Sequence, residues 1–262
     1  MSRKRQPAAT CPRSRLDLYT LACDFESGHR IGSHSHAEHQ LVYASRGVMT
    51  VHTPDGSWVV PAHRGVWVPA RTVHSIEISG AVSMRTLYLA PRIARSVAAS
   101  CHALNVSPLL RELILHAVAL GRMSRRNARH AQLIDLILDQ LEAAQTSAFH
   151  LPQLKDPRAR RIAQLLHNDP SDRRPLGMLT RGMGASKRTI ERAFLADTGL
   201  TFGRWRQQLR LVHSLRLLAA GEKVTSVALA VGYDSLSAFV SAFRRAFGIT
   251  PGRYFRSPAR PR

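Results

Sequence analysis

The stretch that decides the fold is Val224–Tyr254, VTSVALAVGYDSLSAFVSAFRRAFGITPGRY. Its first part places apolar residues at helical spacing up to Val231, and Gly232 then permits a tight turn. Asp234 or Ser235 can cap a second helix at its N-terminus. The stretch is therefore predicted to fold as a helix, a turn and a second helix.

The predicted second helix has one apolar and one polar face. Phe239, Phe243 and Phe247 recur every four residues, so we expect them to form a buried stripe. The opposite face combines small groups that can approach base edges with cations that can meet phosphates, as a helix in the DNA major groove requires. The residues of this face are Leu236, Ser237, Val240, Ser241, Arg244 and Arg245.

The stretch resembles the C-terminal signature of the AraC/XylS family of bacterial transcription regulators, with its A-x-x-x-G-Y turn, F-x-x-x-F helix and G-I-T-P-x-x-Y ending. The positions that carry the resemblance are Ala228, Gly232, Tyr233, Ser235, Phe239, Phe243, Phe247, Gly248, Pro251 and Tyr254. The resemblance implies an activator or repressor that binds double-stranded promoter or operator DNA, and that contacts RNA polymerase if it activates. The alternative is a helical hairpin of an enzyme with a solvated polar face.

The charge distribution favours a polyanionic partner. The 262 residues, which can form two domains, carry a net charge of +21. Residues 1–154 contain 17 Lys and Arg against 10 Asp and Glu, whereas residues 155–262 contain 21 against 7. Because the positive excess is concentrated in the half that contains the motif, nucleic acid is the expected partner.

Cysteine usage and hydropathy indicate a cytoplasmic protein, associated with the nucleoid through DNA binding. Cys11, Cys23 and Cys101 are odd in number and form no C-x-x-C pair, which argues against a disulfide framework or a zinc knuckle. No apolar run approaches the roughly 20 residues of a membrane span, so no membrane partner is expected. Residues 1–15 are charged but lack the apolar segment of a signal peptide, and are predicted to be a disordered leader.

A less regular copy of the motif precedes the first one, at Leu176–Thr198. Its turn is MGAS, Ser186 is the expected cap, and Ile190 and Phe194 face inward. Its helix before the turn departs from the family pattern, because Gly182 interrupts it at a cost of about 1 kcal/mol. The exposed residues of its recognition helix are Lys187, Arg188, Glu191 and Arg192.

A long helix, predicted from the cap at Thr201 to about Ala220, connects the two motifs. With both motifs on one frame, both recognition helices can enter successive major-groove segments about 34 Å apart.

The N-terminal half has a different pattern, because short β-rich runs cut by turns extend from about Leu18 to Leu89. They predict an antiparallel β-barrel or sandwich. Residues 34–40, HSHAEHQ, resemble the first motif of the cupin fold, with Gln40 where metal-binding cupins have glutamate. Residues 69–74 resemble the second motif, with Arg71 in place of a glycine and His74 at the last histidine position.

The cupin resemblance implies one interior site formed by His34, His36, Gln40 and His74. The even spacing of residues 34, 36 and 40 predicts that they project from one face of a strand. Three imidazoles could hold a divalent metal such as Zn²⁺ or Ni²⁺ through His34, His36 and His74, although an amide in place of a carboxylate weakens such a site. The alternative is a small-molecule effector pocket without any cofactor, or histidines that only bond to each other. His39 has the opposite parity and is predicted to be a surface or interface residue.

Two amphipathic helices are predicted between Ser107 and Gln145, with Leu109, Leu113 and Ala117 on the apolar face of the first. They pack on the barrel or pair with a second copy in a homodimer. Because they would lie between the pocket and the linker, they are also the expected relay between the two domains.

The predicted protein is thus α+β with two domains: a cupin-like β-barrel with a C-terminal helical pair, then an all-α domain with two helix-turn-helix motifs. The boundaries are a leader at 1–15, an effector-sensing and dimerisation domain at 16–148, a linker at 149–157, a DNA-binding domain at 158–257 and a tail at 258–262. Two other functions stay open. One is a metal-dependent enzyme with a DNA-binding appendage, for which Glu38 and Glu77 are candidate acid or base groups. The other is an architectural DNA binder without an effector.

Overall fold

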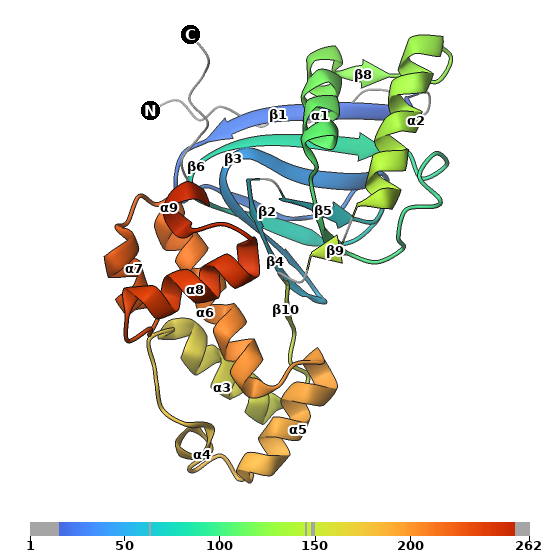
Figure 1. Ribbon diagram of the computed structural model, residues 1–262. Coiled ribbons are helices and arrows are strands. Elements are labelled where there is room, and N and C mark those ends of the chain that lie inside the picture. Colours follow the sequence, from blue (N-terminus) through green and yellow to red (C-terminus); the bar gives the residue numbers. More distant parts are fainter. Residues whose placement is uncertain (1–15, 63, 145, 148–149, 255–262) are drawn as a thin grey trace, which may run out of the picture.

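The computed structural model describes residues 16–62, 64–144, 146–147 and 150–254, so the predicted leader and tail lie outside the described residues. A sheet-rich N-terminal part is followed by a helical C-terminal part (Figure 1). This order confirms the predicted two-part α+β architecture.

The sheet has two long central strands, β3 (His39–Thr53) and β6 (His74–Leu89), which pair antiparallel. The hydrogen-bonded order is β8-β1-β6-β3-β5-β7-β9, while β2 pairs with β6, and β4 pairs with both β3 and β10. Among the described strands no pairing joins β8 to β9, so the predicted closed barrel is not confirmed. The other strands are β1 (Leu18–Phe25), β2 (Arg30–His34), β4 (Gly56–Pro61), β5 (Arg64–Val68), β7 (His102–Asn105), β8 (Arg122–Met123), β9 (Thr146–Ser147) and β10 (His150–Pro152).

Strand β6 shows how alternation places residues on two faces. His74, Ile76 and Ile78 are buried, whereas Ser75, Glu77 and Ser79 are only partly buried. Since successive side chains of a strand point to opposite faces, residues 74, 76 and 78 face the interior of the N-terminal domain, and residues 75, 77 and 79 lie on the other face of the strand.

Helices α1 (Pro108–Leu120) and α2 (Ala128–Ala143) pack on each other at the end of the sheet that lies away from the helical domain (Figure 1). The buried face of α1 contains Leu110, Ile114 and Ala117. The predicted face was wrong in part, because Leu109 is 49% exposed. The predicted stripe, which contains Leu109, and the observed stripe, which contains Leu110, both have helical spacing. Only the position of the sheet determines which of the two is buried.

The helical domain begins at α3 (Pro157–Asn168), and the caps predicted at Ser186, Thr201 and Ser235 accept hydrogen bonds from the first turns of α5, α6 and α8. Helix α4 is a single turn that ends before Gly182, whose φ of 75° suits glycine. The remaining bounds are α4 (Leu176–Leu179), α5 (Lys187–Thr198), α6 (Phe202–Ala219), α7 (Val224–Ala230), α8 (Leu236–Phe247) and α9 (Pro251–Tyr254).

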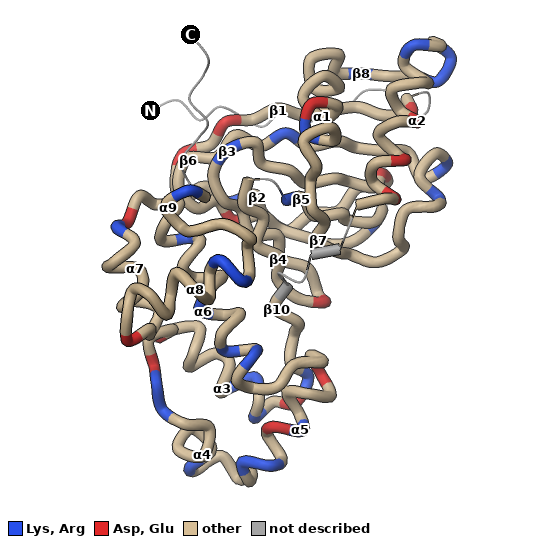
Figure 2. The backbone as a smooth tube through the Cα atoms, viewed as in Figure 1, with Lys and Arg blue, Asp and Glu red and all other residues tan. Residues whose placement is uncertain are grey.

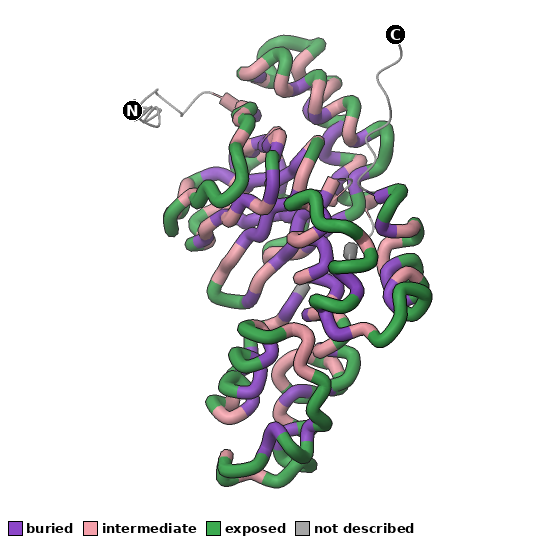
Figure 3. The backbone as a smooth tube through the Cα atoms, turned by 90° about the vertical axis from the view of Figure 1, so that its left-hand side faces the viewer, coloured by how far each residue is buried: buried purple, intermediate pink, exposed green. Residues whose placement is uncertain are grey.

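The two parts share apolar packing at their junction. Val48 and Val59 of the sheet belong to the same core cluster as Leu151, Leu154 and the interior of the helical domain. Buried segments therefore occur both in the sheet and in the helices next to it (Figure 3). The segment predicted as a linker contains β10, which pairs with β4; the domain boundaries themselves stay predictions.

Candidate functional site

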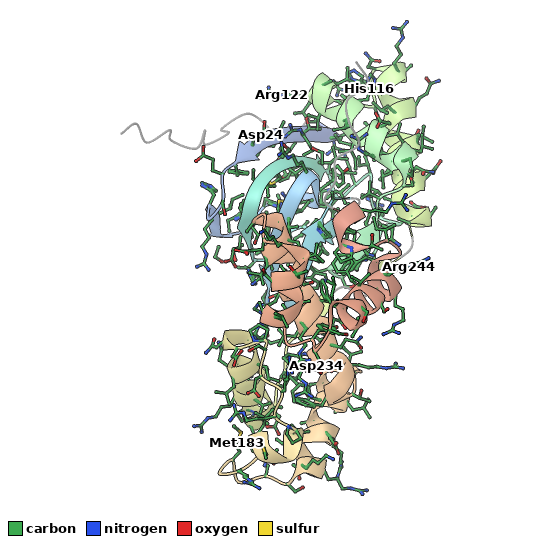
Figure 4. The ribbon with its side chains drawn as sticks, turned by 60° about the vertical axis from the view of Figure 1, so that its left-hand side comes forward. Asp24, His116, Arg122, Met183, Asp234 and Arg244 are labelled. Atoms are coloured by element: carbon green, nitrogen blue, oxygen red, sulfur yellow. The ribbon has the colours of Figure 1, made fainter. Side chains whose placement is uncertain are left out.

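Helix α8 presents the polar face that the sequence predicts. Phe239 and Phe243 are fully buried and fix the orientation of the helix, whereas Phe247 is only partly buried. On the opposite face Val240 is partly buried, and Arg244 points outward (Figure 4). The exposed members of this face are Leu236, Ser237, Ser241, Arg244 and Arg245.

Helix α5 presents the more strongly charged face. Ile190 and Phe194 are fully buried, and Lys187, Arg188, Glu191 and Arg192 are exposed on the other side. Glu191 lies 3.7 Å from the ammonium group of Lys187, one turn earlier. Within the described part of the chain no ion pair involves Arg188 or Arg192, so both guanidinium groups can take a new acceptor. Figure 2 shows Lys and Arg on α5 and on the loop before α4.

Arg210 of α6 ties the two motifs together. Its guanidinium donates to the carbonyls of Pro170 and Asp172, at 3.1 and 2.9 Å, in the loop before α4. A Cβ on Gly232, in the turn of the second motif, would lie 2.7 Å from the same guanidinium. Arg173 also pairs with Asp234. Because these contacts cross between the motifs, they help to position α5 relative to α8.

Three histidines of the N-terminal domain come together in space. The ring centroids of His34 and His74 are 4.3 Å apart and those of His36 and His74 are 5.1 Å apart. One ligand atom from each of the three imidazoles lies within 4.8 Å of the others. The predicted single strand face was wrong, because His34 ends β2, His36 lies in the following loop and Gln40 is in β3.

Each of these imidazoles is oriented by a backbone carbonyl. The Nδ1 atoms of His34, His36 and His74 lie 2.8, 2.7 and 2.9 Å from the carbonyl oxygens of Gly32, Glu38 and Thr72. A carbonyl can only accept, so Nδ1 carries the proton and Nε2 keeps its lone pair in the neutral ring. Burial lowers the pKa of His74 to about 4, against the opposing bond to Thr72, and its shielded Nε2 has no partner among the described residues.

Gln40 adds a fourth lone pair to this cluster. Its amide nitrogen donates to Thr86 Oγ1 at 2.9 Å and to the Tyr88 hydroxyl at 3.1 Å. The hydroxyl of Thr86 donates its proton to the carbonyl of Leu41, so it can only accept from Gln40, which fixes the orientation of the Gln40 amide. Oε1 of Gln40 therefore faces Nε2 of His36, at 3.0 Å. In the neutral tautomer both atoms are acceptors, so a cation between them would be stabilised.

Sequence reasoning missed Thr86 and Tyr88. Both have the even parity of His74 on strand β6, and this parity would have found them once residues 74–89 were read as one strand.

His39 is half-buried, stacks on Trp67 with ring centroids 5.1 Å apart, and accepts a hydrogen bond from the Ala70 amide.

Arg71, which replaces a glycine of the cupin pattern, has a backbone conformation that favours glycine. Its φ is 64°, the one positive value of a residue other than glycine in the described part of the chain. Its amide donates to the carbonyl of His36 at 2.7 Å. The strained turn therefore helps to hold the loop that carries His36.

Residues 24–168 match the AraC-like ligand binding domain, and residues 179–257 match a helix-turn-helix domain. The HTH-type transcriptional regulator NimR of Escherichia coli (strain K12) is 33% identical over 221 residues, which cover 84% of this chain and 81% of that protein. The chain belongs to the AraC family. It is a transcriptional regulator with an N-terminal ligand-binding domain and a C-terminal helix-turn-helix DNA-binding domain.

Two further matches cover different extents of this chain. The HTH-type transcriptional regulator RipA of Corynebacterium glutamicum is 38% identical over 104 residues, which cover 39% of this chain and 31% of that protein. The crystal structure of ToxT from Vibrio cholerae with a bound unsaturated fatty acid aligns with 91% of this chain and 95% of that one, at a TM-score of 0.39 and 12% identity. No described helix is both long and apolar enough to cross a membrane.

Proposed function

We propose that this AraC-family regulator reads DNA with α5 and α8 in response to a small molecule bound in its N-terminal domain. The observation that carries the proposal is the pair of capped helices with exposed polar faces, held on one frame by α6 and Arg210. Such a frame suits two successive major-groove segments of one duplex.

We assign different roles to the two helices. On α5, Arg188 and Arg192 contact guanine edges or flanking phosphates, while Lys187 adds positive charge and Glu191 accepts from a base or orients its neighbours. On α8, Leu236, Ser237, Val240 and Ser241 lack bidentate donors and contact thymine methyl groups, with Arg244 and Arg245 on the phosphates. Readout by α8 is therefore expected to be the weaker of the two.

The effector pocket is formed by His34, His36, Gln40 and His74, and we propose that it senses rather than catalyses. The two carboxylates considered for catalysis support this assignment. Glu77 projects from the outer face of β6, opposite to His74, and bonds to His52 at 3.3 Å. Glu38 is not among the residues whose ligand atoms gather at the site.

The donor set of the pocket also fits a divalent metal such as Zn²⁺ or Ni²⁺. Three Nε2 atoms on a tetrahedral zinc lie about 3.3 Å apart, for bonds of roughly 2.0–2.1 Å. The 4.8 Å limit observed here therefore needs only small side-chain movements. The hydrogen bond from each Nδ1 to a backbone carbonyl is of the kind that sets the tautomer and the ring orientation of histidines that bind a metal. A metal held by His34, His36 and His74 would be a cationic centre, because none of these ligands is charged.

We further propose that the protein acts as a homodimer on nucleoid DNA, and that it contacts RNA polymerase if it activates. Helices α1 and α2 are the candidate dimer elements, since they lie away from the helical domain and leave Leu109, Leu120 and Leu136 exposed. A symmetric dimer would present two pairs of recognition helices to a repeated operator.

The direct test is selection of DNA from a random pool by the full chain, followed by footprinting of the selected sequence. For each protomer we expect two protected segments on one face of the duplex, about one helical turn apart. Protection of a single segment would show that only one of the two helices reads DNA. No enrichment of any sequence would contradict sequence-specific reading.

A further inference from the structure

Helix α6 of the DNA-binding domain packs directly against strands β3 and β6 of the ligand-binding domain. Its partly buried Arg216 donates to the hydroxyl of Thr50 at 3.1 Å, and Thr50 is fully buried. Nε of the same guanidinium is shielded from solvent and has no partner among the described residues. The arginine therefore inserts into the sheet surface instead of extending into solvent.

The surroundings of Arg216 on the sheet are charged. Glu77 lies opposite Thr50 in the β3–β6 register, accepts a hydrogen bond from His52 at 3.3 Å and forms an ion pair with Arg30 at 3.5 Å. Burial lowers the pKa of Arg216, and the charge of Glu77 opposes this effect. Burial alone would raise the pKa of Glu77, but Arg216, His52 and Arg30 together hold it below its ordinary value. The buried positive charge is thus balanced only in the presence of the sheet.

The strands that carry this contact also carry the three-histidine site. In the β2–β6 register His34 lies opposite His74, and Arg30 lies opposite Glu77. The register shifts between Ile31 and His34, so β2 has an irregularity between the two pairs. His74 faces the pocket, and Glu77, three residues later, faces α6. A displacement of β2 or β6 by a ligand would therefore move both.

We propose that the hydrogen bond from Arg216 to Thr50, next to the charge of Glu77, is the latch through which occupancy of the three-histidine site regulates the DNA-binding domain. This inference rests on the effector pocket proposed above. It replaces the relay expected from the sequence, because α1 and α2 lie at the other end of the sheet. The path from the pocket to the latch is short, because His74 and Glu77 lie on opposite faces of the same strand, β6.

The latch stabilises one arrangement of the two domains. A ligand that favours or disfavours this arrangement changes DNA affinity, and DNA then changes ligand affinity by the same factor. Removal of the latch should leave both sites able to bind but should abolish the dependence of one on the other.

The test uses the full chain, Zn²⁺ alone as the probe of the pocket, and DNA selected from the random pool. DNA affinity is measured by fluorescence anisotropy with and without saturating Zn²⁺. In the wild type we expect a change of at least about fivefold. In Arg216→Met and in the nearly isosteric Thr50→Val the ratio should fall to about one, although both variants should still bind Zn²⁺ in the absence of DNA. Arg204→Met, which removes an exposed arginine of the same helix, should keep the wild-type ratio.

A wild-type ratio in both latch variants would overturn the proposal, as would a wild type that binds Zn²⁺ without any change in DNA affinity. If Zn²⁺ does not bind at all, the metal proposed for the pocket is wrong, and the His34→Ala variant then serves as the test of the latch. A latch predicts that His34→Ala changes DNA affinity in the wild type but not in Arg216→Met. Equal effects in the two backgrounds would overturn it.

Discussion

A Cβ atom on Gly80 would lie 2.3 Å from the carbonyl oxygen of Ala219, so strand β6 and the end of helix α6 are in backbone contact. No side chain can shift to relieve such a clash, because the obstacle is main chain. The approach of the DNA-binding domain to the sheet thus requires glycine at this position, both for space and for its φ of 73°.

Gly80→Ala should lower the thermal stability of the full chain and separate the two domains. Gly28→Ala is the matched control, because Gly28 has a φ of 83° and nothing within 4 Å of its missing Cβ. The control should cost about 1 kcal/mol through backbone strain alone, which is a shift of about 2–4 °C in melting temperature. A shift in Gly80→Ala no larger than in Gly28→Ala would show that the domain contact adds no stability.

Arg192→Ala should weaken specific DNA binding by about 1–3 kcal/mol and relax the base preference at one position. Arg188→Ala should act at a neighbouring position of the same half-site. Binding isotherms on the selected DNA and on single-base variants measure both effects. Arg126→Ala removes the same charge from the exposed loop before α2 and should leave base preference intact. An unchanged isotherm for Arg192→Ala would refute its assignment to base readout.

Replacement of both Arg244 and Arg245 by alanine should reduce affinity across many sequences. Each phosphate contact that is lost removes roughly 0.9 from the slope of log affinity against log salt, so the slope should fall by roughly 1.8. Titrations at several salt concentrations measure it. If specificity is lost while the slope stays constant, these arginines read bases instead.

His34→Ala and His74→Ala should abolish the response of DNA binding to the effector, and also Zn²⁺ binding if the pocket holds metal. Gln40→Glu should raise Zn²⁺ affinity, because a carboxylate adds the negative charge that the neutral site lacks. His102→Ala is the control, since its Nδ1 also lies 3.0 Å from a carbonyl, that of Ser100, but it is not part of the three-histidine cluster. Isothermal titration calorimetry distinguishes the variants. Equal Zn²⁺ binding in His74→Ala and wild type would remove the metal assignment.

Asp156→Ala should destabilise the DNA-binding domain by about 1 kcal/mol at neutral pH, because Asp156 caps α3 by accepting from the amides of Arg158 and Ala159. The bond to the Arg158 side chain, more than any other contact, lowers the pKa of this carboxyl to about 2. Because folding lowers this pKa, the ionised carboxyl stabilises the fold at pH values above the ordinary pKa of an aspartate. This stabilisation is lost as the pH falls through the lowered pKa. The difference between wild type and variant should therefore shrink between about pH 4 and pH 2. A constant difference in urea denaturation over this range would contradict the role of the ionised cap.

Helices α5 and α8 could be predicted from sequence because their signals are local. A cap at Ser186 or Ser235 and phenylalanines one turn apart decide the start and the buried face of each helix within a dozen residues. The buried face of α1 could not be predicted in the same way, since Leu109 and Leu110 both continue a helical stripe. Only contact with the sheet, which is remote in sequence, selects between them.

The histidine cluster was predicted in composition but not in geometry. Parity along a single strand placed His34, His36 and Gln40 on one face, yet the chain turns after His34 and returns as β3. The histidines meet because β2 and β3 both pair with β6, which is a property of the sheet and not of the local spacing. Arg216 carries no sequence signal either, because an arginine near a helix C-terminus is ordinarily solvated.

The shared packing of Val48 and Val59 with Leu154 and the helical interior has a consequence for the construction of hybrid regulators. Two modules joined only by a tether can be exchanged at the tether, whereas here a cut at residue 150 would leave each half with an apolar surface made for the other. A chimaera that receives a relative's sensor should aggregate or lose its response unless the residues that face α6 are transplanted with it. The smallest exchangeable unit of this protein is therefore the sensor together with the surface of α6 that it covers.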